Sequence, residues 1–438
     1  MLIWGMWNAV PAPAAGTLLV YTSIGKILIL LESWELGAWS ADLKERPPAT
    51  DGSFMGYYLS GRRFWTTTLP MALLFLAGLS VLGMLAYAGR ERALSGWNDF
   101  LPFYAGGRLA FSGHLYDQAR IMEEERRVTG VFGENLHFIR PPWFAAALWP
   151  IAQMNFSAAH VVWELLAVGA LVVFCFYWLP DKRVASIAAT CCSVPALTSL
   201  MSGQDTPLLL LWMVLGAVLI RRNLLFSAGL VLALCQTKFH IFLPLWVILM
   251  AGGHWRLLRG MAAGHAGLAL WGAAVAGWRW PLDYLASIRN DAVTPGTEHM
   301  PTIYWAAYDL GFRGTAYVAF AVIAIAVAAW FIGKRCDLLT GLAAAPALAM
   351  PFLQHTYIYD AVLLLPLLTL AMQLPSPRLC AMVFPLLTPI PWVACLVGQP
   401  WSLVAPGFVI ALIALRLTFK GSPAESAPAP MPELAQAS

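Results

Sequence analysis

The chain has 438 residues, of which 60% are hydrophobic, 13% aromatic and only 11% charged, with a mean hydropathy of +0.68. Soluble globular proteins carry about 25% charged residues, so this composition excludes a soluble enzyme and a disordered protein. A net charge of +4 is too small to indicate a nucleic-acid partner. The class that remains is an all-α, polytopic membrane protein.

The N-terminal segment 1–64 is predicted to be a cytoplasmic or membrane-associated extension. Its one apolar run, 16–31, contains Lys26 and lacks a small-residue cleavage site, which argues against a signal peptide. Two alternatives stay open: an extra membrane-associated helix, or a translation start placed too early, with Met55 as the true start. The transmembrane domain is predicted over 65–416, and the Pro-, Ala-, Ser- and Glu-rich segment 417–438 as a disordered cytoplasmic tail.

The predicted domain contains many apolar segments, several of them shorter than the ~20 residues of a full membrane span. Short apolar segments bounded by proline indicate broken or re-entrant helices around a cavity. We predict about twelve crossings, with 143–153 re-entrant if 143–179 crosses only once, or else a span of its own. The segments run approximately over 70–89, 143–153, 157–179, 184–201, 206–220, 224–237, 239–253, 257–277, 316–333, 338–352, 360–374, 379–397 and 401–416.

Basic residues in short connections mark the cytoplasmic side of a membrane protein. The connections between the marked ones are then extracytoplasmic: 90–142, 203–205, 238–240, 278–315, 354–360 and 398–400. The two long loops among them contain 10 of the 27 basic residues, but long loops cross the membrane largely regardless of charge. Both chain ends are predicted to be cytoplasmic. The marker residues are Arg62, Arg63, Arg221, Arg222, Arg256, Arg259, Lys334, Arg335, Arg378, Arg416 and Lys420.

The first extracytoplasmic loop begins with Asp99 in the aromatic stretch 97–104. A carboxylate among aromatic side chains is expected to have a raised pKa and to accept a proton. The alternative is an interfacial Asp99 that caps a loop helix. The segment 108–116 is predicted to be an amphipathic helix on the membrane surface, and 123–127 a solvated helix face.

The first loop ends at Arg140, which precedes Pro141 and Pro142. The two prolines are expected to start a helix. Arg140 then lies at the water–lipid boundary, where a lipid phosphate can pair with it. The alternative is an ordinary interfacial anchor.

Two further polar sites follow in the apolar region. Gln204 and Asp205 precede a helix whose N-terminus offers free N–H groups, although Asp205 could simply cap it. Lys238 interrupts a long apolar stretch, and a buried lysine is costly without an anionic partner. A phosphate held by Lys238 and His240 would supply one; the alternative is snorkelling to the interface.

Four further polar residues lie within or between the apolar segments. His355 and Asp360 lie between two apolar segments and either meet a substrate in the same cavity or form a structural hydrogen-bond cluster. His160 and Glu164 are one helical turn apart and are interpreted as a structural pair. The seven cysteines show no CxxC or Cys/His metal spacing and are expected to be buried, inert thiols, with no metal site.

The ordered set of these motifs resembles glycosyltransferase family 87 over about residues 65–416. That family includes mannosyltransferases that use polyprenyl-phosphate mannose and elongate phosphatidylinositol mannosides. Two positions depart from the family pattern: Phe239 replaces a proline between Lys and His, and Arg140 replaces an aromatic residue. The motifs, in chain order, are Asp99-Phe100 with Phe103-Tyr104-Ala105-Gly106, Leu115-Tyr116-Asp117, Pro141-Pro142-Trp143, Gly203-Gln204, Lys238 with His240, and Tyr359-Asp360.

The resemblance implies a GT-C type fold with a helical first extracytoplasmic loop, in the plasma (inner) membrane. It implies inverting, metal-independent transfer of a hexose, commonly mannose, from polyprenyl phosphate to a lipid or glycan acceptor, without a cofactor. Asp99 would be the general base on the extracytoplasmic side. Lys238, His240 and Arg140 would bind the donor phosphate, and the substrate-binding residues would be Tyr104, Gln204, Asp205, His355 and Asp360.

A transporter or flippase for a lipid-linked sugar or a small anion is the alternative function. It would also use broken helices and a lysine at membrane depth. It predicts polar residues at the midplane and on both faces, and a repeat between the two halves. The sequence instead has polar residues biased to one side and no internal repeat, which favours the transferase.

Overall fold

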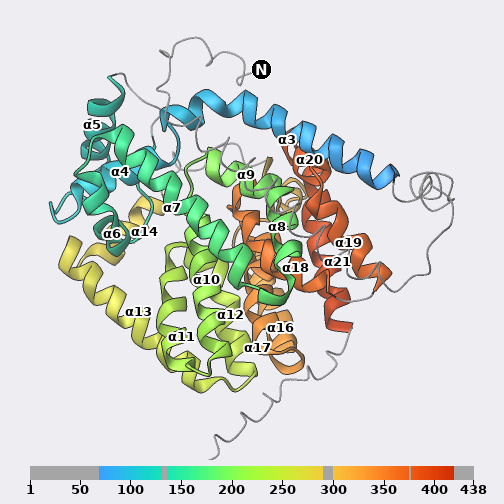
Figure 1. The fold of residues 1–438 in the computed structure, drawn as a ribbon. Helices are drawn as coiled ribbons and strands as arrows, with labels where there is room; N and C mark the ends of the chain where they lie inside the picture. The colour runs from blue at the N-terminus through green and yellow to red at the C-terminus, as the bar shows by residue number, and fades with distance from the viewer. Residues whose placement is uncertain (1–68, 131–135, 290–298, 374–375, 419–438) are drawn as a thin grey trace, which may run out of the picture.

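The computed structural model describes residues 69–130, 136–289, 299–373 and 376–418 (Figure 1). The regular elements within these ranges are all helices, so the predicted all-α class is confirmed. The predicted extension 1–64 and residues 419–438 of the predicted tail lie outside the described residues.

Helix starts in the first third follow from the local sequence. Pro142 occupies the first turn of α6, where its missing N–H is not needed. Asn155 Oδ1 accepts a hydrogen bond from Ala158 N at 2.9 Å and begins α7. Asp117 caps α5 through its side chain. The elements are α3 (Leu69–Ser95), α4 (Phe100–Leu109), α5 (Gln118–Thr129), α6 (Pro142–Ala152) and α7 (Phe156–Tyr177).

The middle third contains the interruption that the sequence predicts at Lys238. A short 3-10 helix that ends at Lys238 separates two α-helical segments. The elements are η3 (Pro180–Lys182), α8 (Arg183–Cys191), α9 (Val194–Met201), α10 (Thr206–Arg221), α11 (Leu225–Leu232), η4 (Ala233–Lys238), α12 (Phe239–Ala251), α13 (Trp255–Ala276) and α14 (Trp280–Ile288).

The last third combines one long helix with several short ones. Pro346 and Pro385 lie inside α17 and α19, where a proline cannot donate the usual helix hydrogen bond. The elements are α15 (Tyr304–Asp309), α16 (Gly314–Arg335), α17 (Leu338–Ala349), η7 (Met350–Phe352), η8 (Ile358–Leu364), α18 (Leu365–Ala371), α19 (Pro377–Leu387), α20 (Ile390–Val397), η9 (Trp401–Leu403) and α21 (Val404–Thr418).

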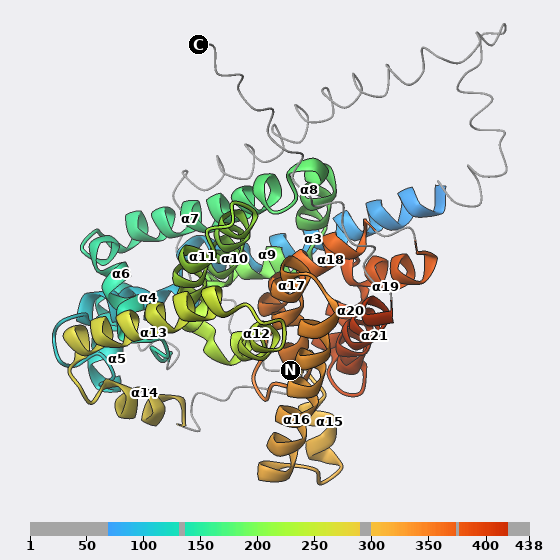
Figure 2. The same cartoon turned by 90° about the horizontal axis from the view of Figure 1, so that it is seen from below.

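Two apolar cores organise the described helices. The larger core is formed mainly by α7 to α13 and α16 to α21. The smaller core joins α4, α5 and α6 to α7 and to the end of α13. Both views show α4, α5 and α6 on one side of the molecule and α19 to α21 on the opposite side (Figures 1 and 2). The predicted first loop is therefore helical and has a core of its own.

Within the described residues, four helices are long and apolar enough to cross a membrane: Phe156–Tyr177, Leu225–Ala251, Gly314–Arg335 and Trp401–Thr418. The pair α8 and α9, bent by 64°, would be a fifth. On α16, Val322, Ile323 and Val327 are exposed, as expected for a helix that faces lipid. The chain is therefore a membrane protein, while the number of about twelve crossings stays a prediction.

The helical run 225–251 changes direction at η4. A straight helix of its 27 residues would hold its ends about 40 Å apart. Both ends instead lie near the start of α13. A Cβ built on Gly260 would lie 2.0 Å from Phe226 O, and α12 leads into α13 through a short turn. The run 225–251 is thus long and apolar enough for one span by length and composition, but it folds back at Lys238 into the two short segments that the sequence predicts.

Helix α6 has 11 residues, which is about 16 Å of helix. The hydrocarbon core of a bilayer is about 30 Å thick, so α6 is too short to cross it alone. It packs instead against α4 and α13. Whether the segment 143–153 is re-entrant in the membrane stays a prediction.

The amphipathic helix predicted over 108–116 is wrong. Helix α4 ends within this range, because Phe111 and Gly113 have φ angles of 67° and 77°, which a right-handed helix cannot contain. The solvated helix face predicted over 123–127 is present only in part. Arg127 pairs with Glu123 at 2.9 Å on the exposed side of α5, but Glu125 is buried.

The cysteines are not uniformly buried, contrary to the prediction. Cys175, Cys235 and Cys395 are buried, but Cys191 is exposed. The cysteines that the structure describes are free thiols. Among the described residues, no group of three or more His, Cys, Asp or Glu side chains is arranged to hold a metal ion.

Candidate functional site

The connections between the helices lie at two opposite ends of the protein. At one end, the Arg221 guanidinium donates to Trp178 O at 3.1 Å and joins α10 to α7. The Arg416 guanidinium donates to Thr340 Oγ1 at 3.3 Å and joins α21 to α17. At the other ends of α10 and α12, six polar side chains meet, which we call the polar cluster: Asp99, Arg140, Gln204, Asp205, Lys238 and Asp360.

Asp99 is the N-cap residue of α4, but its carboxylate does not cap the helix. The neighbouring Asn98 Oδ1 accepts from Phe100 N at 3.0 Å instead. Asp99 N donates to Ser202 O at 3.1 Å, which fixes the start of α4 against the turn after α9. The alternative of a capping Asp99 is therefore wrong, and the carboxylate accepts from Gln204.

The turn after α9 requires a glycine. Gly203 has a φ of +61°, and a Cβ there would lie 2.4 Å from Asn98 Oδ1 and 3.0 Å from Phe100 Cβ. A larger residue would be strained and would displace the start of α4. Trp163 Nε1 donates to Gly203 O at 2.9 Å and holds the turn from the α7 side. This close approach brings Asp99 next to Gln204.

Gln204 connects the Asp99 carboxylate to two cations. Its Nε2 donates to Asp99 Oδ2, while its Oε1 accepts from Lys238 Nζ at 3.3 Å and from Arg140 Nη2 at 3.5 Å. The side chain is 3% exposed. A carboxamide suits this position because it both donates and accepts hydrogen bonds.

Arg140 and Asp205 form a buried, bidentate ion pair. Arg140 Nε donates to Asp205 Oδ2 at 2.7 Å, and Nη2 donates to Oδ1 at 3.0 Å. The guanidinium also lies 5.0 Å from the centre of the Phe103 ring. Arg140 is therefore not an interfacial anchor facing lipid, and Asp205 makes no side-chain cap bond to α10, so that alternative is wrong as well.

Lys238 is buried and pairs with protein carboxylates. Its Nζ lies 2.5 Å from Asp360 Oδ1 and 3.5 Å from Asp205 Oδ1. Asp360 Oδ2 accepts from Tyr357 N at 2.9 Å, which orients the carboxylate. The snorkelling alternative is therefore wrong. The anionic partner that the sequence requires is the Asp360 carboxylate, with Asp205 beside it, while the role of Lys238 in binding a phosphate stays a prediction.

The two carboxylates outside the helical spans have opposite shifts. Burial raises the pKa of Asp99, although the Gln204 hydrogen bond and nearby cations oppose this. Burial also disfavours the charged form of Asp205, but Arg140 and Lys238 overcome it and lower its pKa to about 2. Asp205 is thus a fixed charge, whereas Asp99 is able to gain a proton, as the sequence predicts.

Three predicted residues lie outside these hydrogen bonds. The His355 ring packs edge-on against Tyr357, with ring centroids 4.8 Å apart. His240 lies in the first turn of α12 and packs edge-on against Phe239. Tyr104 belongs to the smaller core, and its hydroxyl donates to Met154 O at 2.8 Å. The structure therefore does not bring Tyr104, predicted as a substrate residue, into the cluster.

Tyr359 borders the cluster, although the sequence indicated it only as part of the Tyr359-Asp360 motif and not as a site residue. Its carbonyl accepts from Thr206 Oγ1 at 3.4 Å, and Lys238 Nζ lies 5.1 Å from the centre of its ring. Its ring centroid is 5.0 Å from that of Tyr357. The only sequence signal was its place directly before Asp360.

The structural pair predicted in α7 is present behind the cluster. His160 Nε2 lies 3.5 Å from Glu164 Oε1. The His160 ring packs on Phe100, with centroids 5.6 Å apart, and a Cβ on Gly96 would lie 2.9 Å from it. The pair therefore supports the start of α4.

The polar cluster combines a proton acceptor with positive charge in a buried setting. Arg140 and Lys238 are paired with Asp205 and Asp360, whereas Asp99 accepts from the neutral amide of Gln204. Such an arrangement fits a reaction in which a hydroxyl loses its proton and an anionic group departs.

The sequence model of glycosyltransferase family 87 matches residues 138–366, which is just over half of the chain. The matched range includes every member of the polar cluster except Asp99. No curated protein and no solved structure matches the chain significantly.

Proposed function

The chain belongs to glycosyltransferase family 87 and is a membrane glycosyltransferase, and on that premise we propose a specific reaction for it. The enzyme moves a hexose, mannose in the first instance, from polyprenyl phosphate to a lipid or glycan acceptor. The transfer inverts the anomeric configuration and uses no metal or other cofactor. The site faces the extracytoplasmic side of the plasma membrane.

The observation that carries the proposal is the side chain of Gln204. One end of its amide donates to the Asp99 carboxylate, and the other end accepts from Lys238. A base for the incoming hydroxyl and a cation for the departing phosphate are therefore separated by a single buried residue. Both groups are needed at one reacting centre when a sugar leaves a phosphate.

Asp99 acts as the general base in this proposal. The acceptor oxygen forms a bond to the anomeric carbon while the bond from that carbon to the phosphate oxygen breaks. The acceptor proton goes to Asp99, and the electron pair departs with the polyprenyl phosphate. The raised pKa of Asp99 makes it a better proton acceptor than an ordinary aspartate.

Lys238 is the cation that contacts the departing phosphate, assisted by His240 at the start of α12. A lysine ammonium is a mobile point charge that can exchange Asp360 for a phosphate oxygen. Arg140 is held in a bidentate pair by Asp205, so its role is to position Asp205 and Gln204. His355 contributes hydrogen bonds to the sugar.

The location of the polar residues in the fold favours a transferase over a flippase. A flippase needs polar groups along a path through the midplane. Among the described residues, five Asp, Glu, Lys and Arg side chains are buried, and four of them belong to the polar cluster at one end. Buried charge is therefore concentrated at that end, which fits chemistry at one membrane face.

The experiment uses membranes from a deletion strain that express wild-type or variant protein. They receive synthetic polyprenyl-phosphate hexose with an isotope-labelled sugar, and mass spectrometry detects labelled lipids and glycans. Asp99→Asn is expected to lower transfer by about 10²-fold or more. Asp181→Asn is the matched control, because Asp181 is exposed in η3 and outside the cluster.

Full transfer by Asp99→Asn would rule out the proposed base. If the labelled lipid changed leaflet without a new hexose on any product, the protein would be a flippase. Loss of one hexosylated species in the deletion strain would identify the acceptor at the same time.

A further inference from the structure

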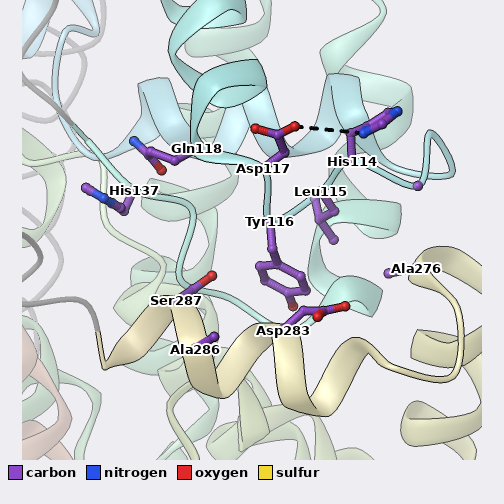
Figure 3. A pocket seen from close by; sticks show the side chains of 11 residues that line it. His114, Leu115, Tyr116, Asp117, Gln118, His137, Ala276, Asp283, Ala286 and Ser287 are labelled. Carbon is purple, nitrogen blue, oxygen red and sulfur yellow. Dashed lines mark ion pairs between the residues drawn. The ribbon is translucent and has the colours of Figure 1, made fainter.

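An open groove lies between the segment 113–118 and α14 (Figure 3). Its volume is about 450 Å³, within the ~300–1,000 Å³ that is usual for small-molecule sites. The segment before α5 forms one wall, and α14 forms the other. Neither belongs to the polar cluster, so the groove is a second candidate binding site.

The groove is lined by groups that bind hydroxyls. Asp117 and Asp283 lie on opposite walls. His114 Nδ1 is 3.9 Å from Asp117 Oδ2, and both side chains are exposed. Ser287 adds a hydroxyl from α14. Carboxylates accept hydrogen bonds from sugar hydroxyls, while two of them repel an anionic ligand.

Tyr116 gives the groove one aromatic side chain. Its ring lies 6.0 Å from that of Tyr284, which is buried in α14 and does not line the groove. An aromatic ring offers an apolar face with polar groups at the edge, and such a face suits the C–H face of a hexose ring. Together with the carboxylates, the Tyr116 ring favours a neutral saccharide as the ligand.

Tyr116 connects the groove to the polar cluster. Its ring points toward α14 beside Asp283 (Figure 3), and its hydroxyl donates to Arg140 O at 2.8 Å. The Arg140 side chain in turn holds Asp205 and contacts Gln204. A ligand in the groove therefore contacts Tyr116, and Tyr116 contacts Arg140, which positions Asp205 and Gln204 at the proposed reacting centre.

We propose that this groove binds the saccharide part of the acceptor, a neutral glycan that contains hexose. The bound glycan presents a terminal hydroxyl to Asp99. The role as an acceptor site rests on the proposed function, whereas binding of a neutral glycan does not.

Steric filling of the groove tests the proposal. Ala286 lines the groove, so Ala286→Trp occupies the space of a sugar without removing a polar group. Leu285→Trp is the matched control, because Leu285 is 41% exposed and does not line the groove. The probes are mannotriose and a galacturonic acid trimer, and binding to the purified full-length protein is measured by saturation-transfer NMR.

The wild-type protein and Leu285→Trp are expected to bind mannotriose, and Ala286→Trp to bind it at least about tenfold more weakly. The anionic trimer is expected not to bind. In the membrane assay, Ala286→Trp raises KM for the acceptor extract and leaves KM for the donor unchanged. The proposal is overturned if wild type binds no mannotriose, if both trimers bind equally, or if Ala286→Trp behaves like Leu285→Trp.

The two proposals fail in different ways. If wild-type protein binds mannotriose but transfers no labelled hexose, the groove is a glycan site and the proposed reaction is wrong. If hexose transfer proceeds and Ala286→Trp changes neither glycan binding nor acceptor KM, the reaction stands and the groove is not its acceptor site.

Discussion

The buried pair of Lys238 and Asp360 allows stability to be separated from chemistry. The two charged atoms are 2.5 Å apart, and the side chains are 6% and 5% exposed. Asp360→Leu leaves the ammonium with Asp205, whose nearest oxygen is 3.5 Å away. Lys238→Met leaves the Asp360 carboxylate without its cation. The double variant Lys238→Met/Asp360→Leu removes both charges and keeps apolar volume.

The expected magnitudes follow from these distances. Breaking a buried ion pair costs about 3–5 kcal/mol, whereas replacing both partners with apolar residues is nearly neutral. Asp360→Leu should fall near the lower value, about 3 kcal/mol, because Asp205 remains as a partner. Lys238→Met should fall near the upper value, about 5 kcal/mol, because Asp360 loses its cation. The double variant should be within about 1 kcal/mol of wild type.

Two measurements read out the three variants. The first is the midpoint temperature of thermal unfolding of the protein in detergent. It is read from the fraction of protein that stays monodisperse on heating. We expect both single variants to unfold at lower temperature and the double variant to recover. The second is labelled hexose transfer, which we expect the double variant to lack even though it is folded.

Either measurement is able to refute the reasoning. If the destabilisation of the double variant equalled the sum of the two single variants, the charges would not be coupled. If the double variant transferred hexose at the wild-type rate, Lys238 would not contact the phosphate.

Three further predictions use single substitutions. Gly203→Ala should destabilise the protein by about 1–3 kcal/mol and lower transfer, whereas Gly130→Ala, with a similar φ of +69° but no atom within 4 Å of the new Cβ, should leave transfer unchanged. Burial raises the pKa of Asp99 above 3.8, so transfer should fall as pH decreases through this raised value. Gln204→Leu should move the acid limb of the pH–rate profile further up, because the lost hydrogen bond favoured the charged carboxylate. Burial raises the pKa of Glu125 from 4.5 to about 8, so folding has to keep this carboxyl protonated at a pH where the unfolded chain would ionise it. Glu125→Gln removes this cost and should raise the unfolding temperature, with no increase below pH 4.5 and a growing increase up to about pH 8.

Part of the site was predictable because isolated charges are costly in apolar segments. Lys238 and Asp360 stood out for this reason, and both belong to the polar cluster. Of the positive charges in short connections, Arg221 and Arg416 lie at the end opposite the cluster, while the assignment of that end to the cytoplasmic side stays a prediction. The helical class followed from composition and needed no knowledge of contacts.

The partners within the cluster could not be predicted, because they are distant along the chain. Arg140 and Asp205 are 65 residues apart, so sequence alone left a lipid phosphate and a cap as their partners. Lys238 required an anion, but charge alone does not distinguish a carboxylate from a phosphate. The helix predicted over 108–116 failed for a local reason, since the left-handed conformation of Phe111 is not visible in side-chain spacing.

The charges of the polar cluster suit the direction of the proposed reaction. With Asp99 ionised, Arg140 and Lys238 face three carboxylates, so the cluster carries an excess negative charge in a buried site. When Asp99 takes a proton from the acceptor, the cluster loses this excess negative charge. Burial favours the neutral form of Asp99, which is why its pKa is raised. At the same moment, negative charge builds on the phosphate and competes with Asp360 for Lys238. In the proposed reaction, proton uptake at Asp99 and departure of the phosphate are coupled through the amide of Gln204, which contacts both Asp99 and Lys238.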